Sequence, residues 1–287
     1  MFPKSILVAI IVLALVSMAC GITVNVPVSE FKTGPTQTMP INIPVPSGGS
    51  ANLTLEFGAG ELRLAPGAAN ALVDGTATYN VAELKPVITV SGQDVLVSTA
   101  NFKLKGIPNI RTKDFENVWD LKLGSAPMAL KINAGAYQSA IELGGLSLNN
   151  LEINDGAAEV KLTFSQPNLA EMKQFVYTTG ASSVSLYNLA NANFAAMNFR
   201  SGAGTYTLDF SGSLKRDASV TIESGVSTVK LIVPQGTPAT VVFKGGLSST
   251  NAHDGWQKSG NEYTNPGSGP ALTITVTMGA GTLELTN

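Results

Sequence analysis

One short phrase, repeated at nearly constant spacing, constrains the fold of this chain more than any other feature. Six segments between residues 130 and 249 fit the pattern apolar-x-apolar-x-x-Gly, and most continue as small-small-x-apolar-x-Leu. Their glycines are separated by 21, 24, 22, 23 and 21 residues: Gly135, Gly156, Gly180, Gly202, Gly225 and Gly246. A fixed period of this length indicates a repeat architecture in which one unit stacks on the next.

Each unit alternates apolar and polar residues on both sides of its glycine, which predicts two short strands joined where the chain turns or takes a positive φ. Stacked in chain order, the units bury a core that no single unit could bury alone. The expected core columns are Leu130, Leu151, Phe175, Met197, Val220 and Val241; Ile132, Ile153, Tyr177, Phe199, Ile222 and Phe243; Val160, Val184, Tyr206 and Val229; and Leu162, Leu186, Leu208 and Leu231. Leucine-rich repeats have a similar period, but the units lack their Leu-rich frame with a fixed Asn. We therefore predict an all-β, single-stranded β-solenoid with coils of about 22 residues.

The outward positions of neighbouring units predict vertical pairs of opposite charge and one amide ladder. The expected stacks are Lys131 on Glu152, Arg200 on Glu223 and Lys244, and Asn133 on Asn154. These are interpreted as structural contacts.

Two further copies of the phrase, "FGAGELRL" at 57–64 and "MGAGTLEL" at 278–285, are expected in coils near the two ends of the rod. Residues 71–106 alternate more like hairpins, with turn signals at Asp74-Gly75 and Ser91-Gly92, and are expected to cap the rod. Residues 167–175 are expected to form a loop or a single helical turn.

Composition narrows the function classes. The chain has 287 residues, of which 44% are hydrophobic and 13% charged, and its 18 basic and 20 acidic residues nearly cancel. It can therefore bury a sizeable core, but it has no broad positive field for nucleic acid. Nucleic acid is not expected as a partner.

The N-terminus carries a targeting signal. Lys4 precedes an unbroken apolar run over residues 6–16, which is too short to span a bilayer comfortably and is typical of a signal peptide. Small residues before Cys20 resemble the lipobox of bacterial lipoproteins, in which cleavage precedes a Cys that carries a diacylglycerol thioether. Ser17 stands where this motif usually has Leu. The alternatives are ordinary secretory cleavage near Ala19 or an uncleaved anchor helix, and all three place the remainder outside the cytoplasm.

The expected organisation follows from these segments. Residues 1–19 form a lipoprotein signal peptide, and 20–50, rich in Pro, Thr, Ser and Gly, form a tether. The β-solenoid covers 51–287, in three parts: 51–125 with irregular coils and hairpins, 126–246 with regular repeats, and 247–287 with a loop and a terminal coil.

The repeated segments resemble a known family. "LTLEFGAGELRLAPGAANALVDGTATYN" with "KPVITV", "WDLKL" at 119–123, "LEINDGAAEVKL" and "LTITVTMGAGTLEL" are similar to bacterial proteins with a toast-rack domain, found in the family of the cell-wall-stress regulator LiaF, and to related adhesin-type β-solenoids. The resemblance covers nearly everything after residue 50. It implies an extracytoplasmic β-solenoid, joined to transmembrane helices in some members, whereas this chain has no such apolar segment after residue 20.

The inventory of catalytic groups is thin. His253 is the single histidine and lies beside Asp254, with Trp256 and Tyr263 nearby, but this stretch is typical of an exposed loop whose aromatics fold onto the rod end. With one Cys, a zinc site of Cys and His is excluded. No P-loop, dinucleotide-binding, nucleophile-elbow or calcium-nonapeptide motif is present. We expect no metal, no cofactor and no catalytic residue.

Carboxylate pairs are the serious catalytic alternative, because some β-helices degrade polysaccharides with acidic residues on an outer face. Asp155 and Glu159 flank Gly156 in exposed slots, and Glu142 and Glu152 could be near in adjacent coils. Single carboxylates on exposed strands are, however, ordinary.

Three functions remain open. The first is a lipid-anchored, non-enzymatic adhesion, binding or scaffold module of the bacterial envelope, with cell-wall glycan or an envelope protein as partner and the membrane held through Cys20. The second is an accessory of the envelope stress response. The third is a polysaccharide-active β-helix enzyme.

Overall fold

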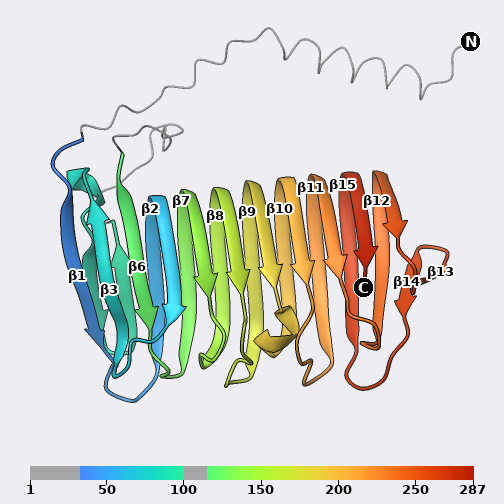
Figure 1. Ribbon diagram of the computed structural model, residues 1–287, viewed down its shortest axis with the longest axis horizontal. Coiled ribbons are helices and arrows are strands. Elements are labelled where there is room, and N and C mark those ends of the chain that lie inside the picture. Colours follow the sequence, from blue (N-terminus) through green and yellow to red (C-terminus); the bar gives the residue numbers. More distant parts are fainter. Residues whose placement is uncertain (1–32, 100–114) are drawn as a thin grey trace, which may run out of the picture.

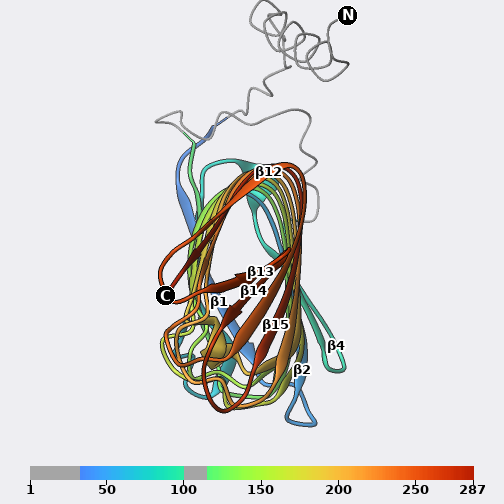
Figure 2. The same ribbon diagram turned by 90° about the vertical axis from the view of Figure 1, so that its right-hand side faces the viewer.

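A computed structural model describes residues 33–99 and 115–287. The described residues form one hydrogen-bonded sheet of 15 strands. The long strands stand side by side in a row (Figure 1). Viewed along the row, each of them bends over the top of the molecule, so that its two halves face each other across the core (Figure 2). The predicted all-β solenoid is confirmed.

Eight long strands make the row, in the spatial order β2, β7, β8, β9, β10, β11, β15, β12, and neighbours are parallel. Their bounds are β2 Ala51–Pro66, β7 Met128–Glu142, β8 Leu148–Thr163, β9 Met172–Tyr187, β10 Phe194–Asp209, β11 Ala218–Ile232, β12 Ala239–Ala252 and β15 Leu272–Thr286. The remaining elements are β1 Gln37–Pro44, β3 Ala71–Tyr79, β4 Val87–Ser91, β5 Asp94–Ser98, β6 Asn117–Leu123, β13 Gln257–Ser259, β14 Glu262–Asn265 and the 3₁₀ turns η1 Ala82–Leu84 and η2 Leu189–Ala192.

The repeated glycines form a ladder midway along the long strands. A Cβ added to Gly202 would lie 2.7 Å from the carbonyl oxygen of Gly180, and one added to Gly225 would lie 2.8 Å from that of Gly202. Neither glycine has a φ in the left-handed region. The close approach of one coil to the next, and not a positive φ, is therefore what requires glycine here.

The predicted core columns are buried. Phe199 has no exposed surface, and its ring lies 5.4 Å from that of Tyr177 and 5.3 Å from that of Tyr206. Of the positions predicted for the four columns, Phe243, near one end of the row, is only partly buried. The strand phase read from the sequence is confirmed.

The outward stacks are also confirmed, except at Lys244. The observed contacts are Lys131 Nζ to Glu152 Oε1 at 2.9 Å, Arg200 Nε to Glu223 Oε2 at 3.1 Å, and Asn154 Nδ2 donating to Asn133 Oδ1 at 3.1 Å.

The stacking order departs from chain order at one end. β15 lies between β11 and β12, so the phrase at 278–285 is in the second-to-last coil, and Thr277 separates Glu223 from Lys244. The physical reason is burial in the second half of the strand. There β15 supplies the buried Leu283 and Leu285, whereas the register partners in β12 are the half-buried Thr250 and the exposed Ala252. An inner coil is covered on both sides, so both halves of its strand need apolar residues that face the core. In β12 only the first half has them, which suits the strand to the end of the row.

The end beyond β12 is capped by a hairpin. β14 pairs antiparallel with residues 239–242 of β12, and β13 pairs with β14. Antiparallel pairing at this end stops the parallel array.

The other end is capped by β6 on the second half of β2 and by β5 on its first half. β3 and β1 continue antiparallel outside β6, and β4 pairs with β5. The turn predicted at Ser91-Gly92 joins β4 to β5 and is confirmed. The turn predicted at Asp74-Gly75 is wrong, because both residues lie inside β3, paired with β6 and β1.

β1 corrects the predicted tether. The Pro, Thr, Ser and Gly content of residues 20–50 predicts a tether throughout, yet residues 37–44 form a strand whose Ile41 and Ile43 are buried in the core. Pro40 and Pro44 are compatible with this strand because β1 pairs on one side alone, with β3, and an edge strand tolerates proline.

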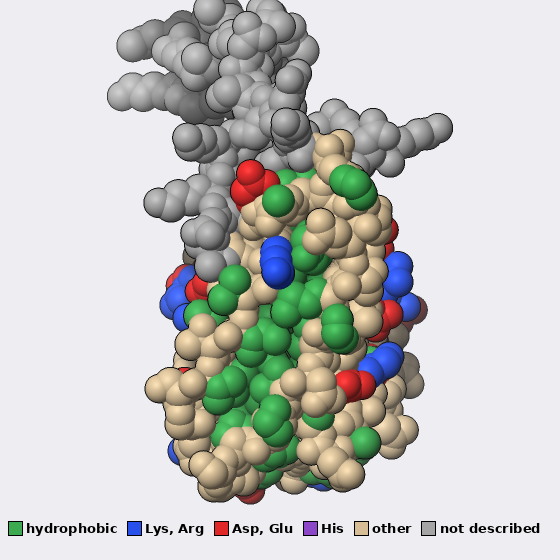
Figure 3. Space-filling model, turned by 90° about the vertical axis from the view of Figure 1, so that its left-hand side faces the viewer, with side chains coloured by type: hydrophobic (Ala, Val, Ile, Leu, Met, Phe, Trp, Pro, Cys, Tyr) green, Lys and Arg blue, Asp and Glu red, His purple; other side chains and the backbone are tan. Residues whose placement is uncertain are grey.

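The end with β1 and β3 shows a band of apolar side chains down its middle, with charged side chains mainly at its margins (Figure 3). Val87 and Val90 of β4, which belongs to the same cap, are exposed by 45% and 54%.

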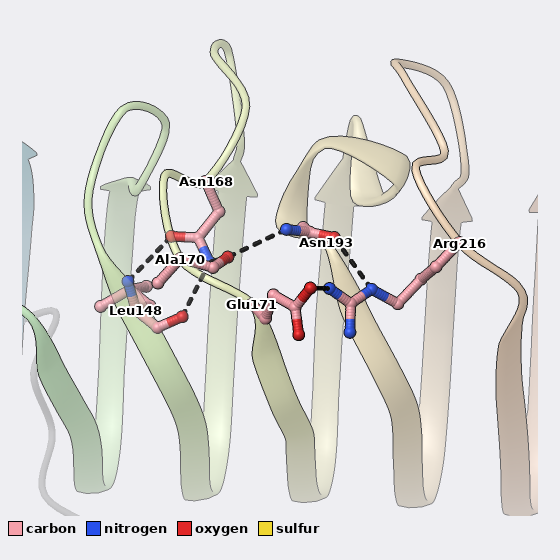
Figure 4. Close-up of polar contacts among 6 residues, drawn as sticks. All are labelled: Leu148, Asn168, Ala170, Glu171, Asn193 and Arg216. Atoms are coloured by element: carbon pink, nitrogen blue, oxygen red, sulfur yellow. Dashed lines mark hydrogen bonds and ion pairs between the residues drawn. The ribbon is translucent and has the colours of Figure 1, made fainter.

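Asparagine side chains fix the return loops, which lie at the lower ends of the coils in Figure 1 and are drawn close up in Figure 4. Asn168 accepts from the Leu148 N–H at 2.8 Å and donates to the carbonyls of Leu148 and Ala170 at 2.7 and 2.9 Å. Residues 167–171 form a loop, as expected, but 172–175 already belong to β9. None of the helical segments in the described parts of the chain is long and apolar enough to cross a membrane.

Candidate functional site

Cys20, the predicted lipid attachment site, lies outside the described residues, as do the signal peptide and the first part of the tether. The prediction therefore rests on the sequence.

The structure does not form a site at the single histidine. His253 and Asp254 are exposed, and the carbonyl of Asp254 accepts from Asn287 Nδ2 at 2.8 Å. Trp256 packs against the core and Tyr263 is buried in it, as predicted for aromatics folded onto the rod end.

Glu142 and Glu152 are not brought together. Glu142 Oε1 accepts from the N–H groups of Gly144 and Ser165 at 2.6 and 3.0 Å, at the end of the second half of β7. Glu152 lies in the first half of β8, paired with Lys131. Both carboxylates stabilise local structure.

The position of Asp155 differs from the prediction, and this difference matters most for the site. The repeat pattern predicts an exposed side chain at this position, but the side chain of Asp155 is half-buried under the bend of β8. Its Oδ2 accepts from Tyr177 Oη at 2.7 Å and from Tyr137 Oη at 3.4 Å, and its Oδ1 accepts from Thr179 Oγ1. Strict alternation from the buried Leu151 and Ile153 puts Asp155 on the same, inner face of β8, whereas counting back from Val160 in the second half of the strand puts it outside.

Burial raises the pKa of Asp155 above its ordinary value, although the hydrogen bonds from Thr179, Tyr177 and Tyr137 oppose the rise. The pKa of Tyr177 is also raised, first by burial. Because desolvation disfavours both ionised forms, the cluster holds its protons more tightly than the free side chains do.

A line of hydroxyls continues from Asp155 along the inside of the bend. Ser182 Oγ lies 2.6 Å from Thr179 Oγ1, whose one proton is donated to Asp155, and it accepts from the N–H of Ala158 at 3.0 Å. Two coils further, Ser224 lies 2.8 Å from Ser201 and 2.6 Å from Ser227 between hydroxyl oxygens. These contacts satisfy polar groups at the bend and stiffen it.

Outside the bend, one register column runs the length of the array. It consists of the residue two positions before each repeated glycine, and we call it the shoulder column: Glu56, Asn133, Asn154, Thr178, Arg200, Glu223, Thr277 and Lys244. Every member is polar. A polar residue two positions before each repeated glycine is visible in the sequence, but sequence analysis interpreted these residues only as separate stacked pairs.

Two cavities lie over the shoulder column. One, of about 500 Å³, is lined by Glu56, Asn133, Asn154 and Asp155 among others, and the second, of about 400 Å³, by Arg200, Ser201, Glu223, Ser224 and Thr277. Thr178 lines both. We call the two cavities together the trough; it follows the axis of the rod from β2 to β15.

Glu159 faces the opposite shoulder of the same coil, where its Oε2 accepts from Gln138 Nε2 at 3.3 Å. Cavities of about 370 and 340 Å³ lie there, and the strands that line them are β2, β6, β7, β8 and β9. Asp155 and Glu159 therefore serve different surfaces and form no catalytic pair. Within residues 33–99 and 115–287, no three His, Cys, Asp or Glu side chains are placed to hold a metal ion.

Comparison with solved structures finds several that resemble this chain over most of its length. The chain is similar to a "putative cell adhesion protein" from Clostridium sporogenes, at 20% identity and a TM-score of 0.50, covering 88% of this chain and 99% of that one. A "putative adhesin" from Bacteroides fragilis has 11% identity and a TM-score of 0.36, covering 88% and 97%. A "putative lipid binding protein" from Parabacteroides distasonis has 12% and 0.38, covering 88% and 98%. At 20% identity the likeness to the Clostridium sporogenes protein concerns the fold alone.

No curated protein matches the chain in sequence. A family match does exist: residues 32–176 match the family described as "N-terminal domain of toast_rack, DUF2154". That range begins just before β1 and ends inside β9, so it includes the N-terminal cap, the first regular coils and half of the trough. The expected resemblance is confirmed, and this chain belongs to the toast-rack family.

Proposed function

We propose that this protein is an extracytoplasmic, non-enzymatic binding module of the bacterial envelope, held at the membrane by a lipid on Cys20. The observation that carries the binding function is the trough, a continuous line of polar side chains on a parallel array of strands.

The names of the structural relatives support this proposal. The relative from Clostridium sporogenes is described as a cell adhesion protein, and the fold it shares with this chain is a rod with long accessible walls. Such walls suit adhesion and scaffolding, because each coil repeats the same surface and so extends the area of contact.

The anchor follows from the sequence. An apolar run at 6–16 followed by Cys20 fits export and lipidation, and roughly a dozen residues separate Cys20 from the first described residue, Thr33. A single lipid chain holds a protein only weakly, whereas the diacylglycerol thioether supplies two chains, which are enough for stable attachment.

The anchoring test is metabolic labelling of a producing bacterium with an alkyne fatty acid. The wild-type protein should be tagged and found in the membrane fraction, whereas Cys20→Ser should lose the tag and leave that fraction. A tag that persists in Cys20→Ser would refute lipidation at this residue. Protease added to intact spheroplasts should cleave the wild-type protein, since the proposal places it outside the cytoplasm.

A second function, polysaccharide cleavage, is favoured by one observation. Asp155, whose pKa is raised, lines the same cavity as Glu56, and glycoside hydrolases use two carboxyl groups that flank the bond to be cleaved. Against it, both oxygens of Asp155 already accept hydroxyl protons from Tyr177 and Thr179. We therefore place this function second.

A further inference from the structure

The chemical groups along the trough limit what it can bind. The amides of Asn133 and Asn154 are linked to each other by one hydrogen bond, in which Asn154 Nδ2 is the donor. That leaves the Asn154 carbonyl oxygen as an acceptor and the Asn133 amide N–H groups as donors. Thr178 adds a hydroxyl between the two cavities. The trough thus presents donors and acceptors in alternation.

The charges along the trough exclude polyanions. Among the described residues that line it, the one cation is Arg200, which is paired with Glu223 at 3.1 Å, and the remaining acidic groups are Glu56 and Asp155. A nucleic acid, or a surface of anionic lipid headgroups, requires cations that are free to contact phosphate. The trough offers none among its lining residues.

A protein partner is also disfavoured. The centre of a protein–protein interface is enriched in exposed aromatic and aliphatic side chains. The large apolar residue that lines the trough, Phe57, is only 1% exposed, and its ring packs 5.1 Å from that of Trp119 inside the core.

The polar groups at the floor of the trough are fixed by hydrogen bonds to residues beneath them. Asp155 is fixed by Tyr137, Tyr177 and Thr179, and Ser224 is fixed by Ser201 and Ser227, so the polar groups at the floor have little freedom to lose when a ligand binds. Preorganised polar groups of this kind bind hydroxyl-rich ligands at a reduced entropic cost.

We infer that the trough binds a neutral, extended glycan chain that lies along the rod axis, with its hydroxyl and amide groups bonded to the shoulder column. This inference rests on the proposed binding function and names its ligand class. Asn133, Asn154 and Thr178 are the residues that determine specificity, and Arg200 with Glu223 bonds the same chain further along.

The length of the trough gives the inference a measurable consequence. From Glu56 in β2 to Thr277 in β15 the column crosses six inter-strand steps, which is about 29 Å at about 4.8 Å a step. Affinity should therefore rise with each sugar until a chain fills this span, and then level off. The cavities over the opposite shoulder are lined by strands no further along the row than β9, so binding there would level off sooner.

The test is calorimetric titration of the purified chain with uncharged β-1,4-linked oligosaccharides of N-acetylglucosamine and of glucose, from disaccharide to hexasaccharide. Polyuronate oligomers of equal length serve as the charged comparison. We expect affinity to increase with length in at least one neutral series and no binding of polyuronate. Absence of binding by both neutral series at millimolar concentration would overturn the inference.

Thr178→Trp fills the point that the two cavities share and should weaken binding at least tenfold. Ser183→Trp is the matched control: Ser183 is exposed in the same strand, on the other side of Gly180, and lines a cavity of the opposite shoulder. It should change affinity less than twofold. If Ser183→Trp weakens binding and Thr178→Trp does not, the ligand lies on the wrong shoulder and the inference fails.

Asn133→Ala provides a smaller substitution that removes hydrogen bonds without filling the trough, and it should weaken binding severalfold. Thermal unfolding of all three variants identifies any loss caused by misfolding. A second measurement, binding to isolated cell envelopes, separates this inference from the proposed function. If the wild-type protein and Thr178→Trp bind envelopes equally well, the protein is still a binding module, but the trough is not its glycan site.

Discussion

The hydroxyl of Tyr177 donates a 2.7 Å hydrogen bond to Oδ2 of Asp155, which lies 22 residues earlier and one coil away. Tyr177 occupies a core column that holds Ile153 on one side and Phe199 on the other, so its phenol is the polar exception in an apolar stack. The pair links the core of the rod to the floor of the trough.

This pair predicts an unusual pH dependence. Burial raises the pKa of Asp155 from its ordinary 3.8, so the folded state holds the proton more tightly than the unfolded state does. The contribution of Asp155 to stability is therefore greatest below pH 3.8 and falls as the pH rises through the folded pKa. Urea unfolding from pH 3.5 upward should show this loss relative to Asp155→Asn. A wild-type profile that runs parallel to that of the variant would contradict it.

The glycine ladder predicts a steep cost for one added methyl group. At Gly180 a Cβ would lie within 3.0 Å of the Gly156 carbonyl oxygen, between two inner coils, and relief requires the coils to separate. Gly180→Ala should destabilise by about 1 to 3 kcal/mol, as overpacked cores do. Gly246→Ala, in the last coil and 3.0 Å from the Gly279 oxygen, should cost less. Equal losses in denaturant unfolding would mean that coil contact does not explain the glycines.

The strand phase is tested by two residues of opposite burial. Phe199 is fully buried between two aromatic rings, whereas Thr221 is exposed in the next coil. Phe199→Ala should cost about 3 to 5 kcal/mol and Thr221→Ala within about 0.5 kcal/mol. Comparable losses from the two substitutions would refute the assigned phase.

The return loops depend on Asn168. It is fully buried and bonds the N–H and carbonyl of Leu148, so Asn168→Ala leaves two buried backbone groups without partners. Each such group costs about 1 to 3 kcal/mol, and a loss of about 2 to 4 kcal/mol is expected. The exposed Asn251 is the control, since Asn251→Ala should be nearly neutral. A neutral Asn168→Ala would show that the loops are held by other contacts.

Much of the fold could be predicted because the repeat carries two independent signals. The period sets the coil, and the alternation around each glycine sets which residues are buried, so columns such as that of Phe199 followed directly. The order of β15 and β12 could not be derived from period alone, because both strands carry the phrase. The polar Thr250 and the small Ala252, where inner coils have large apolar residues, were the available signal for an end coil.

The site was harder to predict than the fold. Alternation counted from Val160 places Asp155 outside, whereas alternation counted from Ile153 places it inside, and only a neighbouring coil reveals Tyr177 as its partner. The trough, likewise, arises from residues about 22 positions apart that the register brings into one line. A single unit contains one residue of the column, and stacking creates the surface.

The most direct test of the central claim, that the rod binds without catalysing, is to incubate the purified protein with bacterial and plant glycans and measure both retained ligand and new reducing ends. We predict saturable retention with no reducing ends above background, unchanged by Glu159→Gln. A steady release of reducing ends that disappears with Asp155→Asn would contradict the account and establish the protein as a polysaccharide-cleaving enzyme.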